Sequence, residues 1–358
     1  MLLVDLEKIT KFKATLTDQL KSNLIKVAEE ALVVKVNPVS NKKHLRFGAT
    51  KNDFVSAAPY WWPNPDTDDG LPYIKKDGQV NPLTTDDDYY DRNRLNVMHD
   101  TFCKLAVAYF YTNDMRYKDA ACEHLYKWFV DPETRMNPSL DYAQQIAGVC
   151  NGRDFGIIDT TCLVNVIDCA LLLNYEKIDD FKEWAAKYLE WLLTDHNGIS
   201  ESKKDNNHGL WYDAQVIALA AFTGNTEVVK TTAINMKDRI ASQVAEDGSL
   251  PEELARTRSY MYSHFALRGI YYAHEISAKF GVQILTQEYK KCFDFLMPFV
   301  NGTKVWKHTQ ILNEEPSDAG ACMYFGYRIF GDVQFREAAN KKYGEMIDNP
   351  TMQLRFPV

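Results

Sequence analysis

Apolar residues recur along most of this chain at intervals of three and four positions, the spacing that places them on one face of an α-helix. The pattern is clearest at 95–109, 178–192 and 333–347. Pairs of helix-breaking residues, such as Asn113-Asp114 and Gly224-Asn225, separate such stretches. Helices joined by short loops, without a run of alternating strands, predict an all-α fold. About a dozen helices are too many for a simple bundle, so we expect a toroid of helical hairpins.

One long segment interrupts the helical pattern. Residues 36–94 contain six prolines and three glycines, and proline at this density prevents a regular helix. A structureless stretch of this length inside a compact domain is usually functional. The segment also carries Tyr60-Trp61-Trp62, an unusual composition for an inert linker. We expect a single domain spanning 1–358, in which 36–94 forms a long loop region over a cleft.

Composition excludes several classes of protein. With 41 Lys and Arg against 49 Asp and Glu, the formal net charge is −8, which argues against a nucleic-acid-binding protein. The seven cysteines include no CxxC pair, and the motifs of zinc peptidases, dinucleotide-binding proteins, P-loop proteins and serine hydrolases are absent. No run of 18 apolar residues predicts a membrane span. The sequence does not indicate an oligomeric state.

The first residues lack the basic stretch and long apolar run of a secretory signal. We therefore expect a periplasmic or secreted protein if a signal peptide has been removed, and a cytoplasmic protein otherwise.

Two segments carry side chains suited to acid–base chemistry. Asn206-Asn207-His208 precedes an apolar helix, where Asn207 could cap the helix and His208 could be either structural or catalytic. Downstream, Arg256, Arg258, Tyr260 and Tyr262 fall within seven positions. A guanidinium binds a carboxylate through two parallel hydrogen bonds, and a tyrosine beside cations can act as base and as acid. Arg256 would then neutralise a carboxylate while Tyr262 moves a proton.

A third segment, 151–159, opens another apolar helix. Arg153 lies between glycines and is well placed to face a cleft, whereas Asp159 is better suited to a capping or supporting role.

Together these segments resemble the alginate lyase family of helical-barrel polysaccharide lyases. The resemblance runs in the same order from about residue 44 to about residue 275 and is carried by 58–65 (APYWWPNP), 70–73, 77–82, 152–153, 156–159, 206–208 and 255–259. It implies an incomplete (α/α) barrel with its cleft at one end. It also implies β-elimination on a uronic-acid polymer without a metal or other cofactor. The expected partner is an anionic polysaccharide or oligosaccharide, alginate first and glucuronan second.

The resemblance also implies roles for individual residues. By position, Asn207 and Arg256 would neutralise the uronate carboxylate, His208 would assist them or act as the base, and Tyr262 would protonate the leaving oxygen. The interval from arginine to tyrosine is one residue shorter here than in the better-known alginate lyases, so Tyr260 is the alternative acid. The expected substrate-binding residues are Tyr60, Trp61, Trp62, Arg92, Arg94, Arg153, Arg258 and Tyr260.

Elimination chemistry needs these residue types. The C5 proton of a uronate is too weakly acidic to remove while the adjacent carboxylate keeps its charge, so that charge must be neutralised before a base can act. Two alternatives remain open. An inverting glycoside hydrolase would depend on an acidic pair instead of His208 and Tyr262. A glycan-binding protein that has lost the chemistry would bind sugar without forming products.

Overall fold

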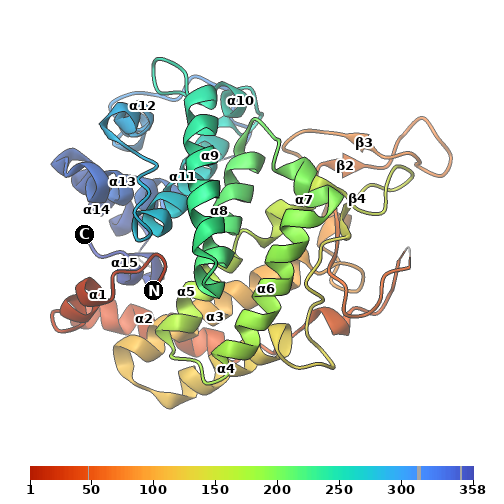
Figure 1. The fold of residues 1–358 in the computed structure, drawn as a ribbon, viewed down its shortest axis with the longest axis horizontal. Coiled ribbons are helices and arrows are strands. Elements are labelled where there is room, and N and C mark those ends of the chain that lie inside the picture. Colours follow the sequence, from red (N-terminus) through yellow and green to blue (C-terminus); the bar gives the residue numbers. More distant parts are fainter. Residues whose placement is uncertain (47, 313–315, 347–348) are drawn as a thin grey trace. The chain divides into compact units, whose positions relative to one another are not determined.

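The computed structural model describes residues 1–358 apart from 47, 313–315 and 347–348. The described chain forms two compact units (Figure 1). Unit 1 comprises Met1–Glu30 and Lys204–Val358, and unit 2 comprises Ala31–Lys203. Helices dominate both units, so the predicted all-α fold is confirmed. The assignment of 1–358 to a single domain stays a prediction.

Helical hairpins form most of unit 1. α8 (Asn207–Thr223) packs against α9 (Thr226–Gln243), and α13 (Pro316–Phe330) packs against α14 (Val333–Glu345). Gly224, whose φ of 83° is left-handed, ends α8, and the Asn225 side chain then caps α9. α11 (Ser259–Ala278) packs against both α8 and α13. The other helices that begin in this unit are α1 (Leu6–Lys13), α2 (Asp18–Leu32), α10 (Pro251–Leu254), η4 (Gln287–Tyr289), α12 (Lys290–Val300) and α15 (Thr351–Arg355).

α8 is buried along nearly its whole length, as expected of a helix that is apolar on every side. The Trp211 indole N–H donates to the main-chain oxygen of Phe265 on α11, over 2.9 Å. A side chain at Gly269 would meet the Trp211 ring at 3.2 Å, so this glycine lets α11 approach closely. These contacts fix the first turns of α8 within unit 1.

In unit 2, α3 (Arg92–Thr112) and α4 (Met115–Phe129) form a helical hairpin. Asn113 ends α3 with a left-handed φ of 60°, and Asp114 caps α4, as the breaker pair in the sequence predicts. α3 also packs against α5 (Leu163–Leu172); α6 (Ile178–Thr194) and α7 (His196–Glu201) follow. α3, α6 and α14 coincide with the three apolar stretches of the sequence, but Ile347 lies outside the described residues.

The proline-rich segment contains short strands and 3₁₀ turns. Its elements are η1 (Val39–Asn41), β1 (Val55–Ala57), β2 (Trp61–Trp62), β3 (Ile74–Lys75) and η2 (Pro82–Thr85), and α3 begins within it at Arg92. β1 pairs in parallel with β4 (Tyr142–Gln145), and β2 pairs antiparallel with β3. These strands replace part of the loop that the sequence predicts.

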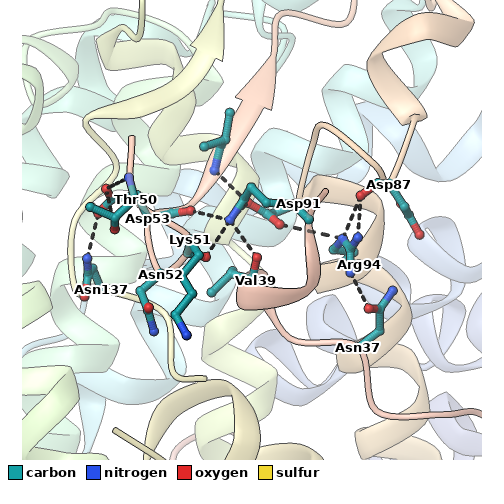
Figure 2. Close-up of polar contacts among 12 residues, drawn as sticks. Asn37, Val39, Thr50, Lys51, Asn52, Asp53, Asp87, Asp91, Arg94 and Asn137 are labelled. Carbon is teal, nitrogen blue, oxygen red and sulfur yellow. Dashed lines mark hydrogen bonds and ion pairs between the residues drawn. The ribbon is translucent and has the colours of Figure 1, made fainter. Parts of the chain in front are cut away.

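A buried ion pair anchors this segment inside unit 2 (Figure 2). The Lys42 ammonium lies 3.0 Å from the Asp91 carboxylate, and both side chains are fully buried. Lys42 also donates to the main-chain oxygens of Val39, Lys51 and Asp53 over 2.6–2.9 Å. Asp91 accepts in turn from the backbone N–H of Val55 at the start of β1. One cation therefore ties together η1, the loop at 51–53 and the residue that precedes α3.

One helical stretch among the described residues, Asp154–Leu172, is long and apolar enough to cross a membrane by length and composition, with a mean hydropathy of 1.7. It contains η3 (Asp154–Thr160) and α5. The stretch does not meet the sequence criterion of 18 consecutive apolar residues, because Asp159 and Asp168 interrupt it. The stretch is 61% buried within the protein, which is typical of a core helix, so it is weak evidence for a span.

Candidate active site

The predicted site residues are distributed over both units. Unit 1 holds the four predicted catalytic residues, with two of the substrate-binding candidates: Asn207, His208, Arg256, Tyr262, Arg258 and Tyr260. Unit 2 holds the remaining substrate-binding candidates, Tyr60, Trp61, Trp62, Arg92, Arg94 and Arg153.

The N-terminus of α8 presents Asn207 and His208. The helix cap is Asn206, whose side chain accepts from the His208 N–H over 3.0 Å. The capping role considered for Asn207 therefore belongs to its neighbour, and the Asn207 side chain has other partners. Asn207 is only 1% exposed, and His208 is buried beside it.

Glu253, on α10, is the partner of Asn207. Its carboxylate accepts from the Asn207 backbone N–H over 2.6 Å and from the Asn207 side-chain Nδ2 over 2.7 Å. Burial raises the pKa of Glu253, while the Asn207 hydrogen bonds and the charges of Arg256 and His208 act to lower it. Glu253 is therefore close to Asn207, His208 and Arg256. It was not among the residues predicted from the sequence.

Arg256 and Tyr262 are in direct contact. The Arg256 guanidinium donates to the Tyr262 hydroxyl over 3.0 Å, and its carbon lies 3.9 Å from the centre of the same ring. α10 ends at Leu254 and α11 begins at Ser259, so a non-helical stretch separates the two residues. Backbone hydrogen bonds to 309–311 hold this stretch, including an isolated bridge between Arg258 and Gln310. This break lets a pair six residues apart meet.

Tyr260, the alternative acid, has a different environment. Its ring packs edge-on against Trp306, with the centroids 4.8 Å apart, and lies 4.4 Å from the His264 ring. It lines a cavity of about 300 Å³ together with Phe299, Trp306, His308 and Gln310. Arg258 is the residue before α11, and its Nε is buried without a hydrogen-bond partner among the described residues. Arg256 contacts Tyr262, whereas the Tyr260 ring packs against Trp306 and His264.

A second polar cluster lies in unit 2 around Asp159. Its carboxylate is 3.3 Å from Arg92 Nε and accepts from Ser56 Oγ over 2.6 Å. Gln144 connects the cluster to Arg153, because its Nε2 donates to Asp159 over 3.3 Å and its Oε1 accepts from Arg153 over 2.7 Å. Burial lowers the pKa of Arg153. Asp159 thus has the supporting role that the sequence predicts: it contacts Arg92 directly and reaches Arg153 through Gln144.

Gln144 in this cluster has an unusual backbone conformation. Its φ of +50° lies in the left-handed region, which costs a non-glycine residue energy and is found preferentially at functional sites. The Gln144 N–H also donates to Ser56 Oγ over 2.7 Å, so its position depends on the pairing of β1 with β4. Neither Gln144 nor Ser56 has a local sequence signal.

Trp61, the second of the three consecutive aromatic residues, lines a cavity. The cavity measures about 240 Å³ and lies within unit 2; its walls include Arg46, Trp61, Tyr73, Tyr90 and Gln145. Trp62 instead donates its indole N–H to the Gln79 main-chain oxygen and has the Lys76 ammonium 5.2 Å from its ring centre. The Tyr60 main-chain oxygen accepts from the Lys76 N–H.

Arg94 is part of the anchor of the proline-rich segment (Figure 2). Its guanidinium donates to the Asp87 main-chain oxygen and to the Asn37 side chain, and it lies 3.7 Å from Asp91. Arg94 is 4% exposed. These contacts give Arg94 a structural role, and substrate binding by this residue stays a prediction.

Among the described residues, no group of three or more His, Cys, Asp or Glu side chains could hold a metal ion. The cysteines, all free, are scattered and half-buried or buried, as expected of small apolar side chains.

Comparisons with known proteins assign the chain to a family. The family model for alginate lyases matches residues 39–306. The chain belongs to the alginate lyase family. The protein is accordingly a polysaccharide lyase, and the glycoside hydrolase and glycan-binding alternatives are not supported. No curated protein matches the chain in a sequence search.

Solved structures of alginate lyases share the fold. The crystal structure of an alginate lyase from Bacteroides ovatus has a TM-score of 0.92 and 29% sequence identity, covering 100% of this chain and 99% of that one. Alginate lyase A1-III from Sphingomonas species A1 has a TM-score of 0.58 and 15% identity, covering 99% and 95%. A variant of A1-III complexed with a tetrasaccharide has a TM-score of 0.60 and 15% sequence identity, covering 99% of this chain and 94% of that one. The predicted incomplete (α/α)-barrel fold is confirmed.

Proposed function

We propose that this polysaccharide lyase cleaves a uronic-acid polymer by metal-independent β-elimination, with alginate as the first candidate substrate and glucuronan as the second. The contact between Arg256 and Tyr262 carries the proposal, because it places a cation beside a proton-transferring group. The family membership and the name of the Bacteroides ovatus structure support alginate as the substrate.

The first requirement of the reaction is neutralisation of the uronate carboxylate. A guanidinium has five N–H donors in a fixed plane, and two of them can bind a carboxylate in parallel. Arg256 would therefore bind the carboxylate while it contacts Tyr262. Asn207, held by Glu253, would add an amide donor at the N-terminus of α8, where the helix dipole also favours an anion.

Proton transfer completes the elimination. A base removes the C5 proton, and its electron pair forms the double bond between C4 and C5. The bond from C4 to the glycosidic oxygen breaks, and that oxygen takes a proton. Tyr262 would supply this proton, and charge that develops on its own oxygen would lie 3.0 Å from a guanidinium nitrogen. His208, buried next to Asn207, would act as the base or assist it.

The cluster in unit 2 would bind carboxylate groups of an anionic polymer. Arg92 and Arg153 are both oriented through Asp159 and Gln144, so each is a preorganised guanidinium of the kind that binds carboxylates. Trp61 would stack on a sugar ring from the wall of its cavity.

The test is product formation from defined uronans. The purified protein is incubated separately with polymannuronate, polyguluronate, glucuronan and a neutral glucan, and the ultraviolet absorbance of the unsaturated uronate is followed. We expect absorbance from at least one uronan and none from the neutral glucan, with and without a metal chelator. Reducing sugars without the absorbance, or no product from any uronan with a folded protein, would contradict the proposal.

A further inference from the structure

Glu253 is a deeply buried carboxyl group whose two oxygens both bind the same residue. It is 2% exposed, and Asn207 donates to it from the backbone N–H and from Nδ2 over 2.6 and 2.7 Å. Burying an ionised carboxylate is unfavourable unless it is well paired. Because both hydrogen bonds come from Asn207, any change at Glu253 acts directly on the orientation of that amide.

The other end of the Asn207 amide lacks a partner. Its Oδ1 is buried and accepts no hydrogen bond from the described residues. An unpaired buried acceptor is destabilising, and an amide oxygen is also the wrong group to stabilise a carboxylate, because both carry only lone pairs. With Nδ2 bound to Glu253, Asn207 has at most one Nδ2 hydrogen left for an anionic substrate, and its Oδ1 stays unsatisfied.

Protonation of Glu253 reverses this arrangement. The oxygen and nitrogen ends of an amide have nearly the same shape, so a half-turn about χ2 exchanges them. A protonated Glu253 donates its O–H to Asn207 Oδ1, and its other oxygen still accepts from the Asn207 backbone N–H. The buried acceptor is then satisfied, and both hydrogens on Nδ2 become available to a substrate carboxylate.

We propose that Glu253 is a positioning residue that, in its protonated form, holds the Asn207 amide with both Nδ2 hydrogens directed toward the substrate carboxylate. The inference rests on the proposed lyase function and names a residue that the reaction needs beyond the four predicted catalytic residues. Glu253 acts through Asn207 and does not itself contact the substrate.

The surroundings of Glu253 decide its protonation. Burial, the largest influence, raises its pKa. The two hydrogen bonds from Asn207 lower it, as do the charges of Arg256 from the stretch after α10 and of His208 from α8. Its sequence neighbour Glu252 is exposed. A bound uronate adds a negative charge next to the same cations, which favours the neutral acid further. Substrate binding and proton uptake by Glu253 are therefore coupled, and activity falls as pH rises through the pKa of Glu253 in the complex.

Glu253→Gln distinguishes this role from a merely structural one. Glutamine permanently supplies an N–H to Asn207 Oδ1 and a carbonyl oxygen to the Asn207 N–H, as the protonated acid does. Using the uronan that the wild type cleaves best, we expect Glu253→Gln to keep kcat within about threefold at acidic pH, since its hydrogen bonds are retained. We also expect it to lose the decline at higher pH that titration of Glu253 causes in the wild type.

Glu253→Leu removes both hydrogen bonds and should lower kcat by about 10²–10³, the usual effect of losing one preorganised donor. Glu252→Gln, on the exposed neighbour, is the matched control and should follow the wild type at every pH. Circular dichroism and thermal unfolding of each variant check that it is folded; Glu253→Gln, with the same shape as glutamate, keeps the test valid if Glu253→Leu does not fold.

The inference is overturned if Glu253→Gln is as inactive as Glu253→Leu, if Glu253→Leu keeps full activity, or if Glu253→Gln and the wild type have the same pH profile. A wild-type protein that forms unsaturated product together with any of these results rejects the role of Glu253 alone. A folded wild-type protein that forms no product from any uronan rejects the lyase proposal and this inference with it.

Discussion

The Tyr262 hydroxyl accepts a hydrogen bond of 3.0 Å from the Arg256 guanidinium, and the guanidinium carbon lies 3.9 Å from the centre of the Tyr262 ring. The same cation thus contacts both the oxygen that would transfer a proton and the face of the ring that carries it. A phenol held in this way has a fixed orientation, because the planar guanidinium constrains the ring and the hydroxyl together. Tyr260, two residues earlier, packs on Trp306 and His264 instead.

The first prediction concerns Tyr262→Phe. Phenylalanine keeps the ring against Arg256 and removes only the proton-transferring oxygen, so we expect kcat to fall by about 10²–10⁴ with little change in KM or in the unfolding temperature. Initial rates of unsaturated-uronate formation measure the effect. Tyr289→Phe, at a tyrosine on η4, is the matched control and should keep full activity. Full activity in Tyr262→Phe with a large loss in Tyr260→Phe would reassign the acid to Tyr260.

A second prediction separates Trp61 from Trp62. Trp61 lines the cavity of about 240 Å³, whereas Trp62 bonds to Gln79 and lies beside Lys76. If Trp61 stacks on a sugar ring, Trp61→Ala should raise KM about tenfold, which corresponds to about 1.4 kcal/mol, and change kcat little. Trp62→Ala should change KM less. Steady-state kinetics on one uronan measure both variants, and equal KM values for the two would refute the distinction.

Local sequence pattern predicted the helices and the Arg256–Tyr262 pair, because both depend on residues close together in the chain. Glu253 could not be predicted, since Glu252 and Glu253 are adjacent and equivalent in sequence; their exposure differs only because one faces Asn207 on α8. Gln144 and Ser56 meet only through the pairing of β1 with β4, across 88 residues of chain. Contacts of this range have no local signal.

Arg92 and Arg94 show how helix geometry directs two nearby side chains to different partners. They are two positions apart in the first turn of α3, and residues at this spacing do not share a helix face. Arg92 accordingly points to Asp159, and Arg94 points to Asp87, Asn37 and Asp91. The two arginines therefore have different partners, although the sequence places them in one group.

A third prediction concerns the anchor of the proline-rich segment. Lys42 and Asp91 form a fully buried pair, whereas Lys43 and Asp88 form an exposed one at 2.9 Å. Lys42→Met leaves Asp91 buried without its cation and removes three bonds to main-chain oxygens, so it should lower the free energy of unfolding by about 3–5 kcal/mol. Lys43→Met should change the free energy of unfolding by about 1 kcal/mol or less.

Denaturant titration of the purified variants measures both effects. A loss below about 1 kcal/mol in Lys42→Met would show that the segment does not depend on this pair for its stability. Should Lys42→Met also lose lyase activity while its folded fraction remains high, the anchor would influence the site in addition to the stability.

The last prediction concerns acid stability. His274 on α11 is buried, and its Nδ1 accepts from the Leu285 N–H over 3.1 Å. Burial, with the nearby Arg328 charge, lowers the pKa of His274 from 6.5 to about 4. The unfolded chain therefore binds the proton more readily than the folded chain, and stability falls as pH decreases from 6.5 toward 4. The difference between these pKa values corresponds to about 3 kcal/mol.

His274→Asn tests this prediction, because the asparagine oxygen can accept the Leu285 hydrogen bond and does not titrate. The free energy of unfolding, measured by denaturant titration at several pH values from 7 to 4, should fall less steeply in this variant than in the wild type. His196→Asn, at a histidine whose side chain is 83% exposed, is the control and should keep the wild-type slope. A buried neutral imidazole must destabilise the folded protein when it binds a proton. Identical slopes for the wild type and His274→Asn would therefore show that another group causes the acid sensitivity.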